Sequence, residues 1–187
     1  PAAAVLGAVL IGSSAWAVVA ILSEWLVPVP KDVLEQMRKV LLPGAESRGL
    51  VASLLLVAAT PALCEEVLFR GVVLRGLATR LTPVGAIVIT GVLFGMFHLN
   101  VWKLLPTALL GIVLSWVAFE SRSLWASMIV HFINNGMLVT LAWLKADQSL
   151  EKLGRGASAA IFAAAVVVSS VGVYLVRRGG RAPRPKT

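Results

Sequence analysis

The chain has 187 residues, of which 58% are hydrophobic and 14% are charged, and its formal net charge is +8. A soluble domain carries about 25% charged residues, so the composition argues against a soluble globular protein. Six tracts contain no Asp, Glu, Lys or Arg, and four of them are 21–23 residues long. Because about 20 apolar residues span a bilayer, we expect an all-α, polytopic transmembrane helix bundle.

We expect about six membrane helices and one interfacial amphipathic helix. In the segment 31–42, KDVLEQMRKVLL, apolar residues recur at helical spacing with charges between them. This pattern suits a helix in the membrane interface, and a loop helix packed on the bundle fits it equally well. We expect one membrane-embedded domain over 1–176 and a basic, disordered tail over 177–187. The membrane helices are expected at 2–23, 49–80, 83–100, 104–119, 123–144 and 157–176.

The expected tail, RRGGRAPRPKT, holds five of the 17 Lys and Arg residues. Basic residues beside a membrane span attract anionic lipid headgroups and favour the cytoplasmic side. Membrane lipids are therefore expected partners, with the tail in the cytoplasm. Nucleic acid is not an expected partner, because the sequence shows no RNA- or DNA-binding module. Since the sequence opens at Pro1 rather than at a methionine, we expect further residues upstream.

The stretch LCEEVLFRGVVL places Glu65, Glu66 and Arg70 inside the second expected membrane helix. A charged side chain at the bilayer centre costs about 2.5–3.5 kcal/mol or more, so each of these groups needs a reason. Glu66 and Arg70 are four residues apart and share a helix face in the favourable order, which predicts an ion pair. Glu65 lies on another face without a local cation. A purely structural network of the three charges would leave Glu65 unexplained.

The third expected helix offers Glu65 a partner, because His98 is the only ionisable side chain in its charge-free tract. In an antiparallel hairpin that turns near 81–83, these two residues lie at the same level. Gly91 and Gly95 share a face with His98, and small residues allow close helix approach. We therefore expect Glu65 and His98 to face each other across one bridging water. The alternative is a histidine that only packs between helices.

The segment HFINNGM contains the second and last histidine, His131, with Asn135 on the same helical face and Asn134 beside them. His131 lies about 14 Å beyond the interface that Arg122 marks, at 1.5 Å per residue. The corresponding depth of Glu65 is about 15 Å. We therefore expect these groups to converge at one depth. The alternative is that the amides and the histidine only bond neighbouring helices.

The motifs EEVLFR, FGMFH and HFINN resemble, in this order, the EExxxR, FxxxH and HxxxN/D motifs of one membrane-protease family. This is the CAAX-protease and bacteriocin-processing family of intramembrane proteases. The stretch SRSLWASMIVH also looks like the loop that precedes that family's last motif. The resemblance covers a motif core at 50–143. It implies a hydrolase that cleaves a peptide bond within the membrane.

Peptide hydrolysis requires an activated water, donors for the developing oxyanion and a proton for the leaving amine. Glu65 is the expected general base, and His98 is expected to position the same water and to shuttle a proton. The resemblance implies that His131 and Asn135 stabilise the oxyanion. These four residues are the candidate catalytic group.

The resemblance also implies supporting roles for three residues. Glu66 and Arg70 correspond to the family's structural pair, and Phe94 to its aromatic position, where core packing explains most of its role. Cys64 is the only cysteine in the chain. We do not expect it to be the nucleophile, because a desolvated thiol is poorly ionised.

Metal dependence separates two mechanisms. Glu65, His98 and His131 could hold zinc and leave a fourth position open. The sequence has no H-E-x-x-H motif, and a metal-free glutamate site serves the same chemistry. We favour the metal-free scheme and expect no cofactor, with zinc as the alternative.

The expected substrate is a membrane-associated or exported peptide or protein, such as a C-terminal sorting segment or a leader. The Ala-, Val- and Arg-rich composition suggests a bacterial protein, which places the chain in an inner (plasma) membrane. The alternative function is a non-catalytic bacteriocin-immunity or membrane scaffold protein of the same fold. A transporter fragment is a further alternative, because buried ionisable groups also mark ion pathways. All three motifs are intact, which neither alternative explains.

Overall fold

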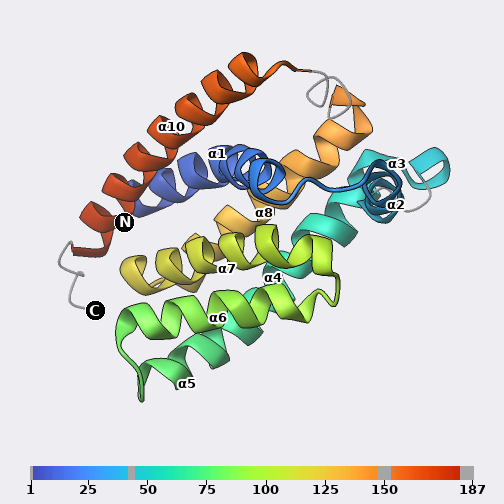
Figure 1. Cartoon of the computed structure of the whole chain (residues 1–187). Helices are drawn as coiled ribbons and strands as arrows, with labels where there is room; N and C mark the ends of the chain where they lie inside the picture. Colours follow the sequence, from blue (N-terminus) through green and yellow to red (C-terminus); the bar gives the residue numbers. More distant parts are fainter. Residues whose placement is uncertain (1, 42–44, 147–152, 182–187) are drawn as a thin grey trace.

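The computed structural model describes residues 2–41, 45–146 and 153–181, and within these ranges it is helical and contains no β-strand (Figure 1). Five helices are long and apolar enough to cross a membrane, and α6 (Pro83–Phe97) is a shorter apolar helix. The expected all-α, polytopic bundle is therefore confirmed. The five long helices are α1 (Ala2–Leu26), a continuous run Gly49–Ala78, α7 (Val101–Ser121), α8 (Leu124–Trp143) and α10 (Arg155–Arg181).

The run that carries the two glutamates changes its helical type along its length. Pro61 has no N–H to offer to the carbonyl of Val57, four residues earlier. The chain widens here: the backbone N–H of Thr60 bonds the carbonyl of Leu55, five residues earlier, and its Oγ1 donates to the same oxygen at 2.9 Å. Such π-helical turns often occur at functional sites. The successive elements are α3 (Ala45–Ser53), η1 (Leu54–Ala59), α4 (Thr60–Glu66), η2 (Val67–Val73) and α5 (Leu74–Ala78).

The expected amphipathic segment forms α2 (Lys31–Leu41), and the last expected residue of that segment, 42, lies outside the described residues. Asp32 lies in the first turn of α2 and Arg38 in the last, an order that the helix macrodipole favours. Arg38 Nη1 also pairs with Glu35 Oε2 at 3.2 Å. The α2 segment is therefore a helix, as the spacing predicts.

The helix α10 extends to Arg181, so residues 177–181 of the expected tail are helical, and 182–187 lie outside the described residues. Arginines in the last turn stabilise a helix by facing its negative end. The α10 helix also packs closely on α1: a Cβ added at Gly179 would lie 2.6 Å from the backbone nitrogen of Ala4. Packing on α1 and the helix dipole together explain why α10 continues through residues 177–181, where composition alone suggests a disordered tail.

The main core lies where α1, α7, α8 and α10 meet. Helices α6 and α7 run side by side as a hairpin next to it (Figure 1). A Cβ added at Gly91 would meet Ile112, and one added at Gly95 would lie 2.8 Å from the Cβ of Ala108, so this small-residue face of α6 packs on α7. The buried core residues are Ala8, Ile11, Ala15, Leu110, Leu114, Val117, Ala126, Val130 and Val176.

Candidate active site

Four elements, α4, η2, α6 and α8, supply the residues that the sequence motifs single out. Glu65 and Glu66 end α4, one turn before Arg70 in η2. Phe94 lies in the last turns of α6, and His98 caps its carboxyl end. The third motif lies on α8, where His131 and Asn134 are buried and Asn135 is half-buried.

The predicted pair of Glu66 and Arg70 forms in the interior. Arg70 Nη1 donates to Glu66 Oε1 at 2.7 Å, and neither side chain is exposed. Arg70 Nη2 donates to the carbonyl of Gly111 at 3.0 Å, and the guanidinium carbon lies 4.5 Å from the centre of the Phe94 ring. The pair thus ties η2 to α7 and α6. Gly111 is a partner that the motifs do not reveal, because a backbone acceptor leaves no side-chain signal in a sequence.

His131 lies between the two glutamates. Its Nδ1 donates to Glu66 Oε1 at 2.9 Å, so this oxygen accepts from both the histidine and Arg70. Its Nε2 lies 3.9 Å from Glu65 Oε2, which is too long for a direct hydrogen bond. Among the described residues, no ion pair joins Glu65 to Arg70. The two adjacent carboxylates therefore have different surroundings.

His98 and His131 pack against the same ring, that of Phe94. His98 Nδ1 donates to the carbonyl of Phe94 at 2.9 Å, which leaves Nε2 unengaged by this bond. The Phe94 ring packs edge-on against His98 and His131, with centroids 5.0 and 5.7 Å apart. No hydrogen bond or ion pair links His98 to Glu65 in the described part of the chain. The expected water bridge between Glu65 and His98 stays a prediction, and the glycine face of α6 packs on α7.

Both histidines line one cavity of about 140 Å³ between α1, α6, α7 and α8. Asn134 and Asn135 also line it, which brings together the polar residues of the second and third motifs. The apolar wall includes Trp16 from α1, a helix to which no motif assigns a role. The full lining is Trp16, Val19, Ala20, Phe94, His98, Pro106, Thr107, Leu110, His131, Asn134, Asn135 and Leu138.

Asn135 donates a hydrogen bond to the carbonyl of Val57, which Pro61 leaves without its usual helical donor. Its Nδ2 donates to the carbonyl of Val57 at 3.1 Å, and its Oδ1 accepts from Asn134 Nδ2 at 3.2 Å. Val57 lies four residues before Pro61, so a proline in the sequence already indicates which carbonyl needs another donor. Asn135 therefore supports the helix of the two glutamates and also borders the cavity.

The histidines resemble zinc ligands in one respect. A metal-bound histidine usually donates its other ring N–H to a carboxylate or a backbone carbonyl, and His131 and His98 are both held in this way. However, across residues 2–41, 45–146 and 153–181 no three His, Cys, Asp or Glu side chains are grouped closely enough to hold a metal ion. The described arrangement therefore does not bring Glu65, His98 and His131 together around one ion.

One family model matches part of the chain. Residues 47–137 match the family described as type II CAAX prenyl endopeptidase Rce1-like. This range contains all three motifs and the whole cluster around His131. No curated protein and no solved structure matches the chain. Residues 47–137 are therefore similar to the Rce1-like type II CAAX prenyl endopeptidases, in a chain with five helices long and apolar enough to cross a membrane.

Proposed function

We propose that the protein is an intramembrane endopeptidase in which Glu65 activates the attacking water without a metal. The observation that carries this proposal is the position of His131, with Nδ1 2.9 Å from Glu66 and Nε2 3.9 Å from Glu65. Glu66 is fully buried and engaged by Arg70, whereas Glu65 is 22% exposed. Its buried Oε2 has no hydrogen-bond partner among the described side chains. One carboxylate therefore holds the histidine, and the other is available to a water molecule.

The proposed reaction is a direct hydrolysis. Glu65 takes a proton from the water while the water oxygen bonds to the carbonyl carbon of the scissile peptide. The carbonyl oxygen becomes an oxyanion, which accepts hydrogen bonds from His131 Nε2–H and the Asn135 amide. The carbon–nitrogen bond then breaks as the proton passes to the amine nitrogen, which yields one carboxyl and one amino terminus. The Nε2 of His98 orients the water and assists this proton transfer.

Glu66 and Arg70 act as positioning residues in this scheme. Because Glu66 Oε1 accepts from Nδ1, it fixes the orientation of the His131 ring and directs Nε2 towards Glu65. Arg70 neutralises Glu66 inside the bundle and anchors it to α7 through Gly111. Phe94 fixes the spacing of the two histidine rings and the guanidinium by contacting all three.

The proposed substrate is a membrane-associated or exported peptide, such as a C-terminal sorting or leader segment. The cavity of about 140 Å³ is smaller than the roughly 300–1,000 Å³ of small-molecule pockets, so an extended peptide would place a single side chain in it. We place the chain in a bacterial inner membrane, with the arginine-rich end of α10 in the cytoplasm. Cysteines introduced at Arg80 and Glu24, in a chain that lacks Cys64, would test this orientation by labelling from one side.

The test compares cells that express the wild-type protein or the Glu65→Gln variant. Peptides whose termini appear only with the wild type identify the cleaved bond, and purified protein in lipid vesicles should cut a synthetic copy of that bond. Cys64→Ala is the matched control, because Cys64 is the exposed neighbour of Glu65. Equal cleavage products from wild type and Glu65→Gln would contradict the proposal and favour a non-catalytic protein of this fold.

A further inference from the structure

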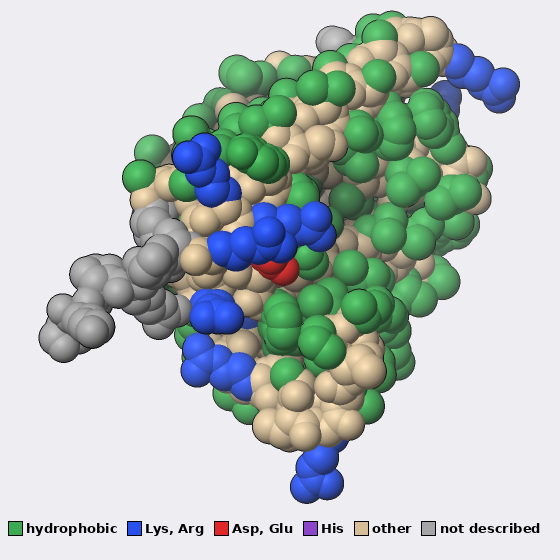
Figure 2. All heavy atoms as spheres, turned by 90° about the vertical axis from the view of Figure 1, so that its left-hand side faces the viewer, with side chains coloured by type: hydrophobic (Ala, Val, Ile, Leu, Met, Phe, Trp, Pro, Cys, Tyr) green, Lys and Arg blue, Asp and Glu red, His purple; other side chains and the backbone are tan. Residues whose placement is uncertain are grey.

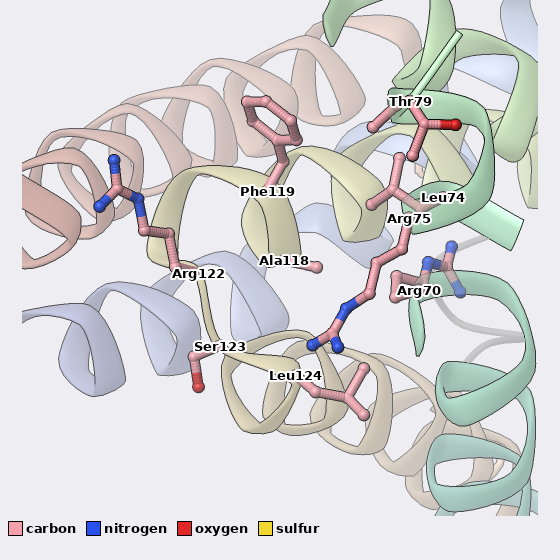
Figure 3. Close-up of a pocket in the computed structure, with 10 residues that line it drawn as sticks. Arg70, Leu74, Arg75, Thr79, Ala118, Phe119, Arg122, Ser123 and Leu124 are labelled. Carbon is pink, nitrogen blue, oxygen red and sulfur yellow. The ribbon is translucent and has the colours of Figure 1, made fainter. Parts of the chain in front are cut away.

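A second and larger pocket, of about 340 Å³, lies apart from the histidines (Figure 3). Figure 3 shows Arg75 extending from α5 across this space towards Leu124 at the start of α8, with Arg122 on the opposite wall. Three arginines line the pocket, and its described lining contains no carboxylate. The lining residues are Arg70, Leu74, Arg75, Ala78, Thr79, Ala118, Phe119, Arg122, Ser123 and Leu124.

Arg70 contributes a buried, charged side chain to the lining of this pocket. The side chain is 2% exposed, and its Nε has no hydrogen-bond partner among the described residues. The other two guanidinium nitrogens are engaged by Glu66 and Gly111. A buried N–H without an acceptor costs free energy, so an acceptor bound in the pocket would relieve that cost.

The start of α8 adds a second source of positive potential. Ser123 is the N-cap residue of this 20-residue helix, and its side chain makes no capping hydrogen bond. The first N–H groups of a helix are unsatisfied and favour an anion. Because Ser123 and Leu124 line the pocket, these groups and the three arginines act on the same space.

The pocket lies at the basic end of the bundle. The α5–α6 turn, the α7–α8 turn and the carboxyl end of α10 share one end in Figure 1. Figure 2 shows Lys and Arg side chains gathered on the face that looks out from that end. Arg177 on α10 lies over the ring of Trp116, 5.6 Å from its centre. Basic and aromatic side chains at the ends of apolar helices mark the level of lipid headgroups.

We propose that this pocket binds the phosphate group of an anionic phospholipid. Arginine recognises phosphate with paired, charge-assisted hydrogen bonds, and basic pockets between membrane helices hold lipid headgroups. The apolar side chains of the rim argue for a lipid over a free anion. Phe119 lines the pocket and is 38% exposed. Trp125, the residue after Leu124, is 70% exposed. These surfaces provide contact for the glycerol and the upper acyl chain while the phosphate faces the arginines.

The test is a lipid titration of purified protein in neutral detergent, followed by native mass spectrometry. Phosphatidylglycerol should form a retained one-to-one adduct, and phosphatidylcholine should compete poorly. The variants Arg75→Gln and Arg122→Asn should each weaken the adduct about fivefold, the equivalent of roughly 1 kcal/mol for one arginine at a lipid surface. Arg80→Gln is the matched control, because Arg80 is an exposed arginine of the same turn that does not line the pocket.

Arg122→Asn also separates binding from folding. Arg122 has φ 52°, a left-handed conformation in which asparagine is common, so this variant keeps the backbone geometry, and its thermal midpoint in neutral detergent is measured beside its lipid affinity. Equal weakening by Arg80→Gln, or equal binding of phosphatidylcholine, would overturn the proposal. A thermal shift with inorganic phosphate as large as that with phosphatidylglycerol would assign the pocket to a free anion and would also overturn it.

Discussion

His131 Nδ1 and Glu66 Oε1 lie 2.9 Å apart, in a position where both side chains are almost fully buried. The same carboxylate oxygen accepts from Arg70 at 2.7 Å, so one atom joins the first and third sequence motifs. Glu66 therefore has two partners, of which the sequence reveals one. The fold and the orientation of the histidine both depend on this carboxylate.

Glu66→Gln should lower stability more than any other conservative change in the cluster. The amide cannot neutralise Arg70, and breaking a buried ion pair costs about 3–5 kcal/mol because an uncompensated charge remains. Thermal unfolding of the purified protein in detergent measures this loss. The paired change Glu66→Gln with Arg70→Gln removes both charges and should recover part of the stability. A Glu66→Gln protein with the wild-type midpoint would contradict the buried pair.

Glu65→Gln should abolish cleavage and leave stability nearly unchanged, in contrast to Glu66→Gln. The side chain is partly exposed and makes no ion pair within 3.5 Å in the described structure, so the protein should fold with a near wild-type midpoint. Cleavage should fall to background, because the amide cannot take the proton of the attacking water. Initial rates on the identified substrate, with the midpoint measured in parallel, check both parts. Retained cleavage at the normal rate would show that another group acts as base.

The helices could be predicted from the sequence because charge-free tracts of this length have few alternatives in a bilayer. The Glu66–Arg70 pair could also be predicted, since a spacing of four residues fixes the face within one helix. The link from Glu66 to His131 joins residues 65 positions apart, and its formation depends on how α8 rotates against α4. Helical periodicity does not determine that rotation.

The water-bridged approach of His98 to Glu65 stays a prediction, because it depends on the rotation of α6 as well as on the level of the two residues. The prediction that Gly91 and Gly95 approach the helix of Glu65 was wrong, because these glycines pack on α7. A face of small residues on one membrane helix can pack closely against any neighbouring helix, and the sequence alone does not show which neighbour it contacts. The bond from Asn135 to Val57 was missed, although Pro61 indicates that this carbonyl loses its helical partner.

Asn135→Ala should affect both rate and stability, and Pro61→Ala should separate the two effects. Loss of an oxyanion donor costs about 10²–10³ in rate, and loss of the bond to Val57 leaves a carbonyl without that donor. Pro61→Ala supplies a backbone N–H that can bond Val57 in the usual helical way. The double variant should therefore regain the thermal midpoint but remain slow. Full recovery of the rate by Pro61→Ala would show that Asn135 acts only through the helix.

Gly91→Ala should destabilise the bundle, whereas Gly76→Ala should not. A Cβ at position 91 would meet Ile112, with its backbone nitrogen 2.7 Å away, so α6 and α7 must separate. Position 76 has no neighbour within 4 Å of such a Cβ. Removing a glycine from an open helical position stabilises by roughly 0.5–1 kcal/mol. Thermal unfolding in detergent compares the two, and an equal effect of both substitutions would contradict the close contact of α6 with α7.

The last prediction distinguishes carboxylate from metal catalysis. A zinc site would have to recruit Nε2 of His98, Nε2 of His131 and the carboxylate of Glu65, each at about 2.0–2.2 Å from one ion. Both Nδ1 atoms donate elsewhere and leave Nε2 for an ion, but the three side chains are not grouped closely enough in the described structure, so such a site would require them to come closer together. We expect purified, active protein to contain no stoichiometric metal and to keep its activity in a strong chelator. Elemental analysis of the same preparation used for the rate assay makes this comparison. One equivalent of zinc per chain, lost together with activity and restored by added zinc, would make these three residues ligands and replace the carboxylate mechanism.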